Sequence, residues 1–188
     1  MTSRLVVDTI QASTLGGNMV TIPTGQSLYA PGHIIQMFQT VKNNLFSSNS
    51  TSFIDLPGLS VSINPKSINS KIMVSYNVHT SIINGGYGCM LRLLRNDAVL
   101  SAATGQGGGS PATTIAYSDN NAASLYPVYI QNMSYLDSPG TVSTLTYRLQ
   151  VSGWQVSAGN FYINQSGAGV SSSLGTAIST ITVMEIGG

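Results

Sequence analysis

The side chains able to do acid–base chemistry are few and scattered along the sequence. The six acids are Asp8, Asp55, Asp97, Asp119, Asp137 and Glu185. They stand in separate segments, mostly in or beside turns, where an Asp side chain hydrogen-bonds to its own backbone. General acid–base catalysis needs such groups placed together, so the pattern predicts turn or surface roles and no enzyme. A cluster of carboxylates contributed by several chains stays open.

Metal, cofactor and nucleophile motifs are equally sparse. His33 and His79 have no second ligand at a metal-site spacing, so one chain alone is not expected to bind a metal, although a trimer could gather three copies of one His on its axis. The glycine run at Gly105–Ser110 lacks the Lys-Ser/Thr end of a phosphate-binding loop and is interpreted as flexible. The lone Cys89 has apolar neighbours and is predicted to be an inert core thiol. No cofactor is expected.

Aromatic side chains are the better candidates for ligand recognition. They are Tyr117, Tyr126, Tyr129, Tyr135, Trp154 and Tyr162. Flat rings bordered by amides and hydroxyls suit the apolar faces of sugars, and Tyr117, Tyr126 and Trp154 are predicted as possible glycan contacts. The alternative for any one of them is a place in the core with its polar atom hydrogen-bonded.

Composition narrows the class of protein and of partner. Hydrophobic residues make up 42% of the 188 residues, but charged residues only 7%, with a formal net charge of +1. A disordered chain has little hydrophobicity and a high net charge, so this chain is predicted to fold. The seven Lys and Arg form no basic stripe, which argues against nucleic acid as a partner. Neither a secretion leader nor a membrane-spanning run is expected.

The apolar residues recur at every second position, which predicts strands nearly everywhere. The clearest are Lys71–Val78 and Thr144–Val151, each with one apolar and one polar face. Further strands are predicted at His33–Val41, Ser52–Ile54, Leu59–Ile63, Gly88–Leu94, Tyr126–Met133, Asn160–Asn164 and Ala177–Ile186, with a hairpin tip at Asn96-Asp97. The spacing predicts an all-β protein, an antiparallel β-sandwich of roughly eight to ten strands.

The first 32 residues differ from the rest. Short β-like pieces carry apolar side chains on both faces, and a Pro-Gly corner separates them from the strand that follows. Two short strands cannot bury both faces by themselves. We therefore expect residues 1–32 to be an attachment and oligomerisation stem, with residues 33–188 as the head; the alternative is a hairpin lying on its own sandwich. The residues expected at the interface are Leu5, Val7, Ile10, Val20, Ile22 and Leu28.

A resemblance to a known class supports this organisation. The block "LVVDTIQAS…GGNMVTIPTGQSLYAPGHIIQ" (Leu5–Gln36), the segment "LPGLSVSINPKSINSKIMV" (Leu56–Val74) and the closing "STITVMEI" resemble virion structural proteins of tailed bacteriophages, particularly those of marine bacteria and cyanobacteria. The resemblance implies a fibre-like or capsid-decorating homotrimer on the virion surface. It also implies a jelly-roll head similar to the tumour-necrosis-factor and complement-globular families, and other virion proteins as partners.

Two functions follow as expectations. The first is a structural protein that decorates or stabilises the capsid or forms a short fibre. The second is a tail-fibre-type adhesin whose loops, such as 105–119 and 166–173, hold host polysaccharide. The short stem and the absence of an internal repeat favour the first.

Overall fold

The computed structural model describes residues 30–82, 88–106, 110–117, 127–154, 160–168 and 175–188. The chain divides into two units, Met1–Ala30 and Pro31–Gly188, and every strand reported below belongs to the second. The stem predicted for residues 1–32 lies almost entirely outside the described residues and stays a prediction. The same holds for its interface residues Leu5, Val7, Ile10, Val20, Ile22 and Leu28.

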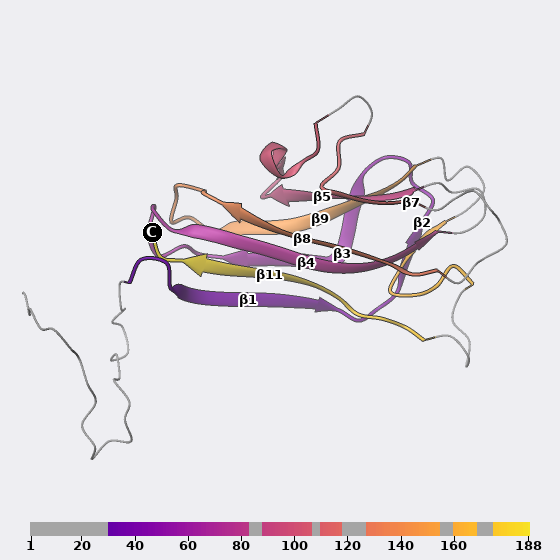
Figure 1. The fold of residues 1–188 in the computed structure, drawn as a ribbon, viewed down its shortest axis with the longest axis horizontal. Helices are drawn as coiled ribbons and strands as arrows, with labels where there is room; N and C mark the ends of the chain where they lie inside the picture. Colours follow the sequence, from indigo (N-terminus) through magenta and orange to yellow (C-terminus); the bar gives the residue numbers. More distant parts are fainter. Residues whose placement is uncertain (1–29, 83–87, 107–109, 118–126, 155–159, 169–174) are drawn as a thin grey trace, which may run out of the picture. The chain divides into compact units, whose positions relative to one another are not determined.

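Six strands form the first sheet. They are β1 (Ile34–Lys42), β2 (Phe46–Ser48), β4 (Lys71–Ile82), β8 (Tyr129–Asp137), β10 (Phe161–Ile163) and β11 (Ser179–Ile186). The central strand is β4, which pairs with β8 along one side and with β11 and then β10 along the other. β1 pairs with β11 and β2 with β10, all antiparallel. Figure 1 shows β1, β11 and β4 side by side.

Five strands form the second sheet. They are β3 (Ile54–Ile63), β5 (Gly88–Arg95), β6 (Ala98–Val99), β7 (Thr114–Tyr117) and β9 (Leu145–Trp154). β9 lies between β3 and β5, and the other side of β5 is shared by β7 and β6. The one helical turn in the described part of the chain is a 3₁₀ turn at Ser101–Ala103. No helix there is long and apolar enough to cross a membrane.

The pairing of strands defines the topology. β5 pairs with β7, β4 with β8, β3 with β9, and β1 with β11, so the antiparallel pairs are nested one inside the next along the sequence. This is the order produced when one long antiparallel hairpin is rolled into two packed sheets, which is a jelly roll. The predicted all-β antiparallel sandwich is confirmed, and the strand order that the sequence left open is decided.

Alternation of side chains fills the core between the sheets. In β4, Ile72, Val74 and Val78 are buried with Tyr76, as the period of two predicts. In β9, the residues buried on the facing side are Leu145, Tyr147, Leu149 and Val151. Ile181 and Val183 of β11 and Leu91 and Leu93 of β5 complete the same cluster.

Several predicted strand boundaries are wrong, each for a local reason. The two strands predicted around residues 52–63 are one strand, β3, because Gly58 takes a φ of +82° and lets the strand bend at Pro57-Gly58 without ending. β8 begins and ends later than predicted, at Tyr129–Asp137. β2 and β7 lie in segments interpreted as turns or loops. The predicted hairpin tip at Asn96-Asp97 is confirmed as the turn between β5 and β6, although only Asn96, with φ 54°, takes a positive φ.

Of the four acids within the described residues, Asp137 and Glu185 are buried, contrary to the turn or surface roles predicted for them. Asp137 accepts two hydrogen bonds from Arg95 Nη1, at 2.9 and 2.8 Å, and one from the Tyr147 hydroxyl at 2.6 Å. This links β8 of the first sheet to β5 and β9 of the second. Glu185 accepts from Gln36 Nε2 and from the Lys66 backbone N–H, each at 2.6 Å. Burial is tolerated because each carboxylate has partners.

The core thiol and a core phenol make the stability of the fold sensitive to alkali. Burial raises the pKa of Cys89 from 9.0 to about 12, and burial likewise raises the pKa of Tyr76 from 10.0 to about 12. Cys89 is fully buried, as predicted. Since both pKa values are higher in the folded state, the protonated groups stabilise the fold below the unfolded pKa and this contribution is lost as pH rises towards the folded value.

We therefore expect the free energy of unfolding to fall between about pH 9 and pH 12, at about 1.4 kcal/mol per pH unit for each titrating group. Urea unfolding across this range should show a shallower fall for Cys89→Ala than for the unchanged chain. The variant's own loss of packing is a constant offset, so the slope is the quantity compared. Equal slopes would contradict the expectation.

The two ends of the sandwich are different. At one end, Gly32 N–H donates to Gly187 O at 2.7 Å and Gly187 N–H donates to His33 O at 2.9 Å, so the start of the head lies beside its last residues. At the other end β5 begins at Gly88, while β7 ends at Tyr117 and β9 at Trp154. Figure 1 shows the C-terminus and the start of β1 at the first end and β7 at the second.

Candidate functional site beside the edge strands β7 and β8

Tyr117 and Trp154 meet on the outer face of the second sheet. Tyr117 of β7 and Trp154 of β9 are both in register with Gly88 of β5, which lies between them. Their rings form an edge-to-face pair with centroids 5.7 Å apart and an interplanar angle of 80°. They remain 56% and 43% exposed. Such a pair is a rigid apolar platform open to solvent.

Gly88 makes the pair possible. A Cβ atom at this position would lie 3.0 Å from two ring atoms of Tyr117. Only a residue without a side chain lets the Tyr117 ring lie over β5, from where it reaches Trp154. Glycines paired with a cross-strand aromatic ring are a known device of β-sheets.

A groove lies next to this pair, along the side where β7 and β8 are the edges of their sheets. Its volume is about 390 Å³, within the range of small-ligand sites. The described residues that line it are Thr114, Ile115, Ala116, Tyr117, Tyr129, Ile130, Gln131 and Asn132. Tyr117 thus belongs both to the groove and to the aromatic pair. None of these lining residues carries a charge.

Polar groups from both sheets form the inner wall of the groove. Gln131 Nε2 donates to the Thr80 hydroxyl and to Cys89 O, each at 3.2 Å, and so bridges the two sheets. The Tyr76 hydroxyl and the Thr114 hydroxyl lie 2.9 Å apart, a second bridge. Gln131 Oε1 is buried and has no hydrogen-bond partner among the described residues. A buried acceptor without a donor is costly, which makes this atom notable in the wall of a groove.

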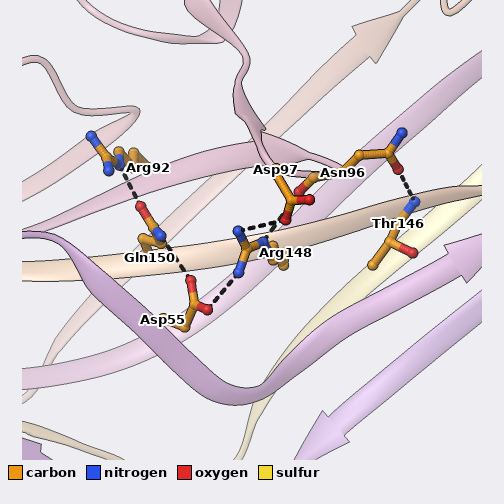
Figure 2. Close-up of polar contacts among 7 residues, drawn as sticks. All are labelled: Asp55, Arg92, Asn96, Asp97, Thr146, Arg148 and Gln150. Carbon is orange, nitrogen blue, oxygen red and sulfur yellow. Dashed lines mark hydrogen bonds and ion pairs between the residues drawn. The ribbon is translucent and has the colours of Figure 1, made fainter.

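A charged network occupies the rest of the outer face of the second sheet (Figure 2). Arg148 pairs with Asp55 and, at 3.1 Å, with Asp97. Gln150 connects Asp55 to Arg92 through hydrogen bonds of 2.7 Å each. Both acids are more than half exposed and paired with arginine, so they tie β3, β9 and the β5–β6 turn together on the surface. The surface role predicted for Asp55 and Asp97 is confirmed.

The histidines lie apart from this face. His79 Nδ1 is 2.8 Å from Ile178 O, beside the first sheet, and His33 stands at the opposite end, where its carbonyl accepts from Gly187. No group of three or more His, Cys, Asp or Glu suited to hold a metal occurs within the described ranges. Asp8 and Asp119 fall outside them.

The structure brings together two of the three aromatic residues predicted as ligand contacts. Tyr117 and Trp154 are in contact, while Tyr126 lies outside the described residues. Of the other tyrosines named from the sequence, Tyr129 lines the groove, and Tyr135 packs against the core. Tyr162 lies in β10, half-buried. Residues 114–117, interpreted from the sequence as part of a binding loop, are instead the strand β7 that forms one wall of the groove.

Sequence reasoning missed Gly88, Gln131 and Asn132. The sequence predicts Gly88 only as the first residue of the strand Gly88–Leu94, which gives it no role in a site, and amide residues occur throughout the chain. The one available signal was the alternation in β8, which places Gln131 on the inner face among apolar neighbours. Their grouping depends on β7 and β8 meeting as sheet edges, which no local pattern indicates.

The fold and this site define a jelly-roll β-sandwich with an aromatic groove at one open side. The sequence matches no protein-family model and no curated protein. Solved structures to which the chain is similar include that of infectious bursal disease virus Gx strain, at 11% identity and a TM-score of 0.36, covering 89% of this chain and 45% of that one. T=1 particles derived from infectious bursal virus give 12% identity and a TM-score of 0.37, covering 93% and 42%.

The VP2 subviral particle of infectious bursal disease virus gives 11% identity and a TM-score of 0.32, covering 90% of this chain and 42% of that one. The chain thus spans less than half the length of each of these proteins. Similarity at this level does not by itself establish a fold or a function.

Proposed function

We propose that this protein is a structural component of a virus particle, on the surface of a tailed-bacteriophage virion. In this role it assembles as a homotrimer that decorates or stabilises the capsid or forms a short fibre, and it has no catalytic activity. The observation that carries the proposal is the arrangement of the two ends of the jelly roll. Gly32 and His33, where the predicted stem joins the head, lie beside Gly187, and the aromatic groove reaches the opposite end.

This arrangement suits a protein held at one end and exposed at the other. The chain enters the head at Gly32 and His33, and in this proposal that end is the one held on the particle or against other copies. The connections from β4 to β5, β7 to β8 and β9 to β10 all leave strands at the far end. Loops at the end away from an attachment are the ones free to contact the surroundings.

The low charge of the chain supports a place on a particle in salty water. Only 7% of the residues are charged, and the described ion pairs are those of Arg95 and Arg148. Contacts made by apolar burial and neutral hydrogen bonds are little affected by salt, whereas exposed ion pairs are screened. Assembly should therefore depend weakly on ionic strength.

In this proposal the stem makes the contacts that hold the trimer together. The stem residues Leu5, Val7, Ile10, Val20, Ile22 and Leu28 face neighbouring copies or the particle surface. A symmetric assembly lets one sequence supply every contact, which is the most economical way to shield apolar side chains that point both ways.

Removal of residues 1–32 is expected to convert the trimer to a monomer. Sedimentation equilibrium should give about three times the 19.7 kDa chain mass for the full chain and a single chain mass for the truncated one. The head should stay folded, since all the described strands lie beyond residue 33. A truncated trimer as robust as the full one would contradict the role of the stem, and a monomeric full chain would contradict the trimer itself.

A tail-fibre-type adhesin that binds host polysaccharide is the second candidate. The exposed pair Tyr117 and Trp154 favours it, because an apolar platform open to solvent suits the flat apolar faces of sugars. The number of copies per particle separates the two functions. Quantitative mass spectrometry of purified virions should give hundreds of copies for a capsid decoration and only a handful for an adhesin, and absence from the virion would overturn both.

A further inference from the structure

We propose that the groove between β7 and β8, together with the Tyr117–Trp154 pair, binds a neutral saccharide. This goes beyond the structural role and deepens the second candidate function, on which it rests for the class of ligand, by naming the site and the kind of saccharide; it does not depend on where in the particle the protein is placed. The inference rests on three features found together: an exposed aromatic platform, a groove that continues from it, and an inner wall of uncharged hydrogen-bonding groups.

The aromatic platform selects a ligand with a flat apolar face and polar edges. The Tyr117 and Trp154 rings are held perpendicular to each other, so a ligand can lie on one ring while its edge contacts the other. The platform is formed before any ligand arrives, since the pair is in register with Gly88 on a continuous sheet. Pre-organised rings lose little side-chain entropy on binding. A pyranose ring, with C–H groups on its faces and hydroxyls around its rim, has these properties.

The inner wall of the groove favours ligands that carry hydroxyl groups over ligands that carry charges. Gln131 lines the groove, and its buried Oε1 has no donor among the described residues, so a rotation of the amide towards the groove would let a ligand hydroxyl supply the missing hydrogen bond. Asn132 and Thr114 add an amide and a hydroxyl to the lining of the groove. Tyr129 also lines it. Because none of the described lining residues is charged, an acidic polysaccharide would lose hydration there without gaining an ion pair. A neutral saccharide loses less hydration free energy on entering the groove.

The sequence supplies a specific reporter, because Trp154 is its sole tryptophan. The full-length protein is titrated with neutral gluco-, manno- and galacto-oligosaccharides and, as the charged comparison, with oligogalacturonate, while tryptophan fluorescence is recorded. We expect a saturable change with at least one neutral oligosaccharide and none with oligogalacturonate. No saturable change with any neutral oligosaccharide would overturn the proposal, and so would tighter binding of oligogalacturonate that weakens with salt.

Variants locate the binding. Tyr117→Ala keeps the reporter and should weaken binding about tenfold, as expected for the loss of one aromatic contact. Gly88→Val, which pushes the Tyr117 ring away without removing it, should weaken binding in the same direction. The matched control is Phe38→Ala, another exposed aromatic residue, in β1 at the other edge of the first sheet, which should leave binding unchanged.

Binding by Tyr117→Ala as tight as that of the unchanged chain would overturn the assignment of the site. Circular dichroism and the thermal midpoint establish that each variant is folded, and if Gly88→Val unfolds, Tyr117→Ala still decides. The result is independent of the proposed virion role, because saccharide binding is measured on the isolated protein and virion location on purified particles.

Discussion

Replacement of Asp137 by alanine is expected to lower the free energy of unfolding by about 3 kcal/mol. The Asp137 carboxylate holds Arg95 and the Tyr147 hydroxyl, and so joins β8 to β5 and β9 across the two sheets. Without it, both donors lose their acceptor. Arg95 is one-third exposed, so its charge regains some water, which places the loss at the lower end of the range for a broken buried pair. Urea unfolding at neutral pH measures the difference.

Controls separate the buried link from a general effect of removing an acid. Asp55→Ala removes a carboxylate that is 58% exposed, and it should lower the free energy of unfolding by no more than about 1 kcal/mol. Asp137→Asn keeps an acceptor for Tyr147 but loses the charge opposite Arg95. Its loss of unfolding free energy should lie between those of Asp55→Ala and Asp137→Ala. A loss for Asp137→Ala no larger than that for Asp55→Ala would show that the carboxylate does not hold the sheets together.

Replacement of Glu185 by alanine is expected to lower the free energy of unfolding by about 2 kcal/mol. Its two carboxylate oxygens accept from the Lys66 backbone N–H and from Gln36 Nε2, and Gln36 also donates to Asn64 O at 2.7 Å. The carboxylate therefore fastens the first strand of the head to β11 and to the turn after β3. Since Glu185 is fully buried, water cannot readily replace it as the acceptor.

The start of β1 should loosen with this substitution more than the rest of the head. In Glu185→Ala the β1 amides should exchange faster than the loss of global stability explains. The exchange rates of the β5 and β9 amides should change only as much as the free energy of global unfolding predicts. Glu185→Gln keeps one carbonyl acceptor and should lose less stability than the alanine variant. Asp97→Ala, whose side chain is 99% exposed, serves as the neutral comparison. Unchanged exchange in β1 would contradict the proposed fastening.

The proposed function and the further inference make separate demands on this molecule. The virion role depends on the stem and on the end of the sandwich that carries Gly32 and Gly187. Saccharide binding depends on Tyr117 and Trp154 at the far end and on the wall that includes Gln131. The two can therefore be disrupted one at a time, by truncation of the stem or by substitution in the groove.

The sequence by itself determined the fold class, the faces of the strands and the character of the thiol. Alternation with a period of two is local, so it assigned the buried faces of β4 and β9 correctly before any pairing was known. The apolar neighbours of Cys89 likewise predicted its burial. The resemblance to phage virion proteins contributed the expectation of a jelly roll but not the order of its strands.

Tertiary structure alone decided the nested strand order, the burial of two acids and the binding groove. Asp137 reads as a turn residue, yet it lies in β8, where it pairs with Ile72 of β4, and its side chain is buried because Arg95 and Tyr147 of other strands meet it there. Tyr117 and Trp154 meet only because β7 and β9 flank the same glycine of β5. These outcomes depend on contacts between residues far apart in the chain, and a period read along one strand carries no information about which strand becomes its neighbour.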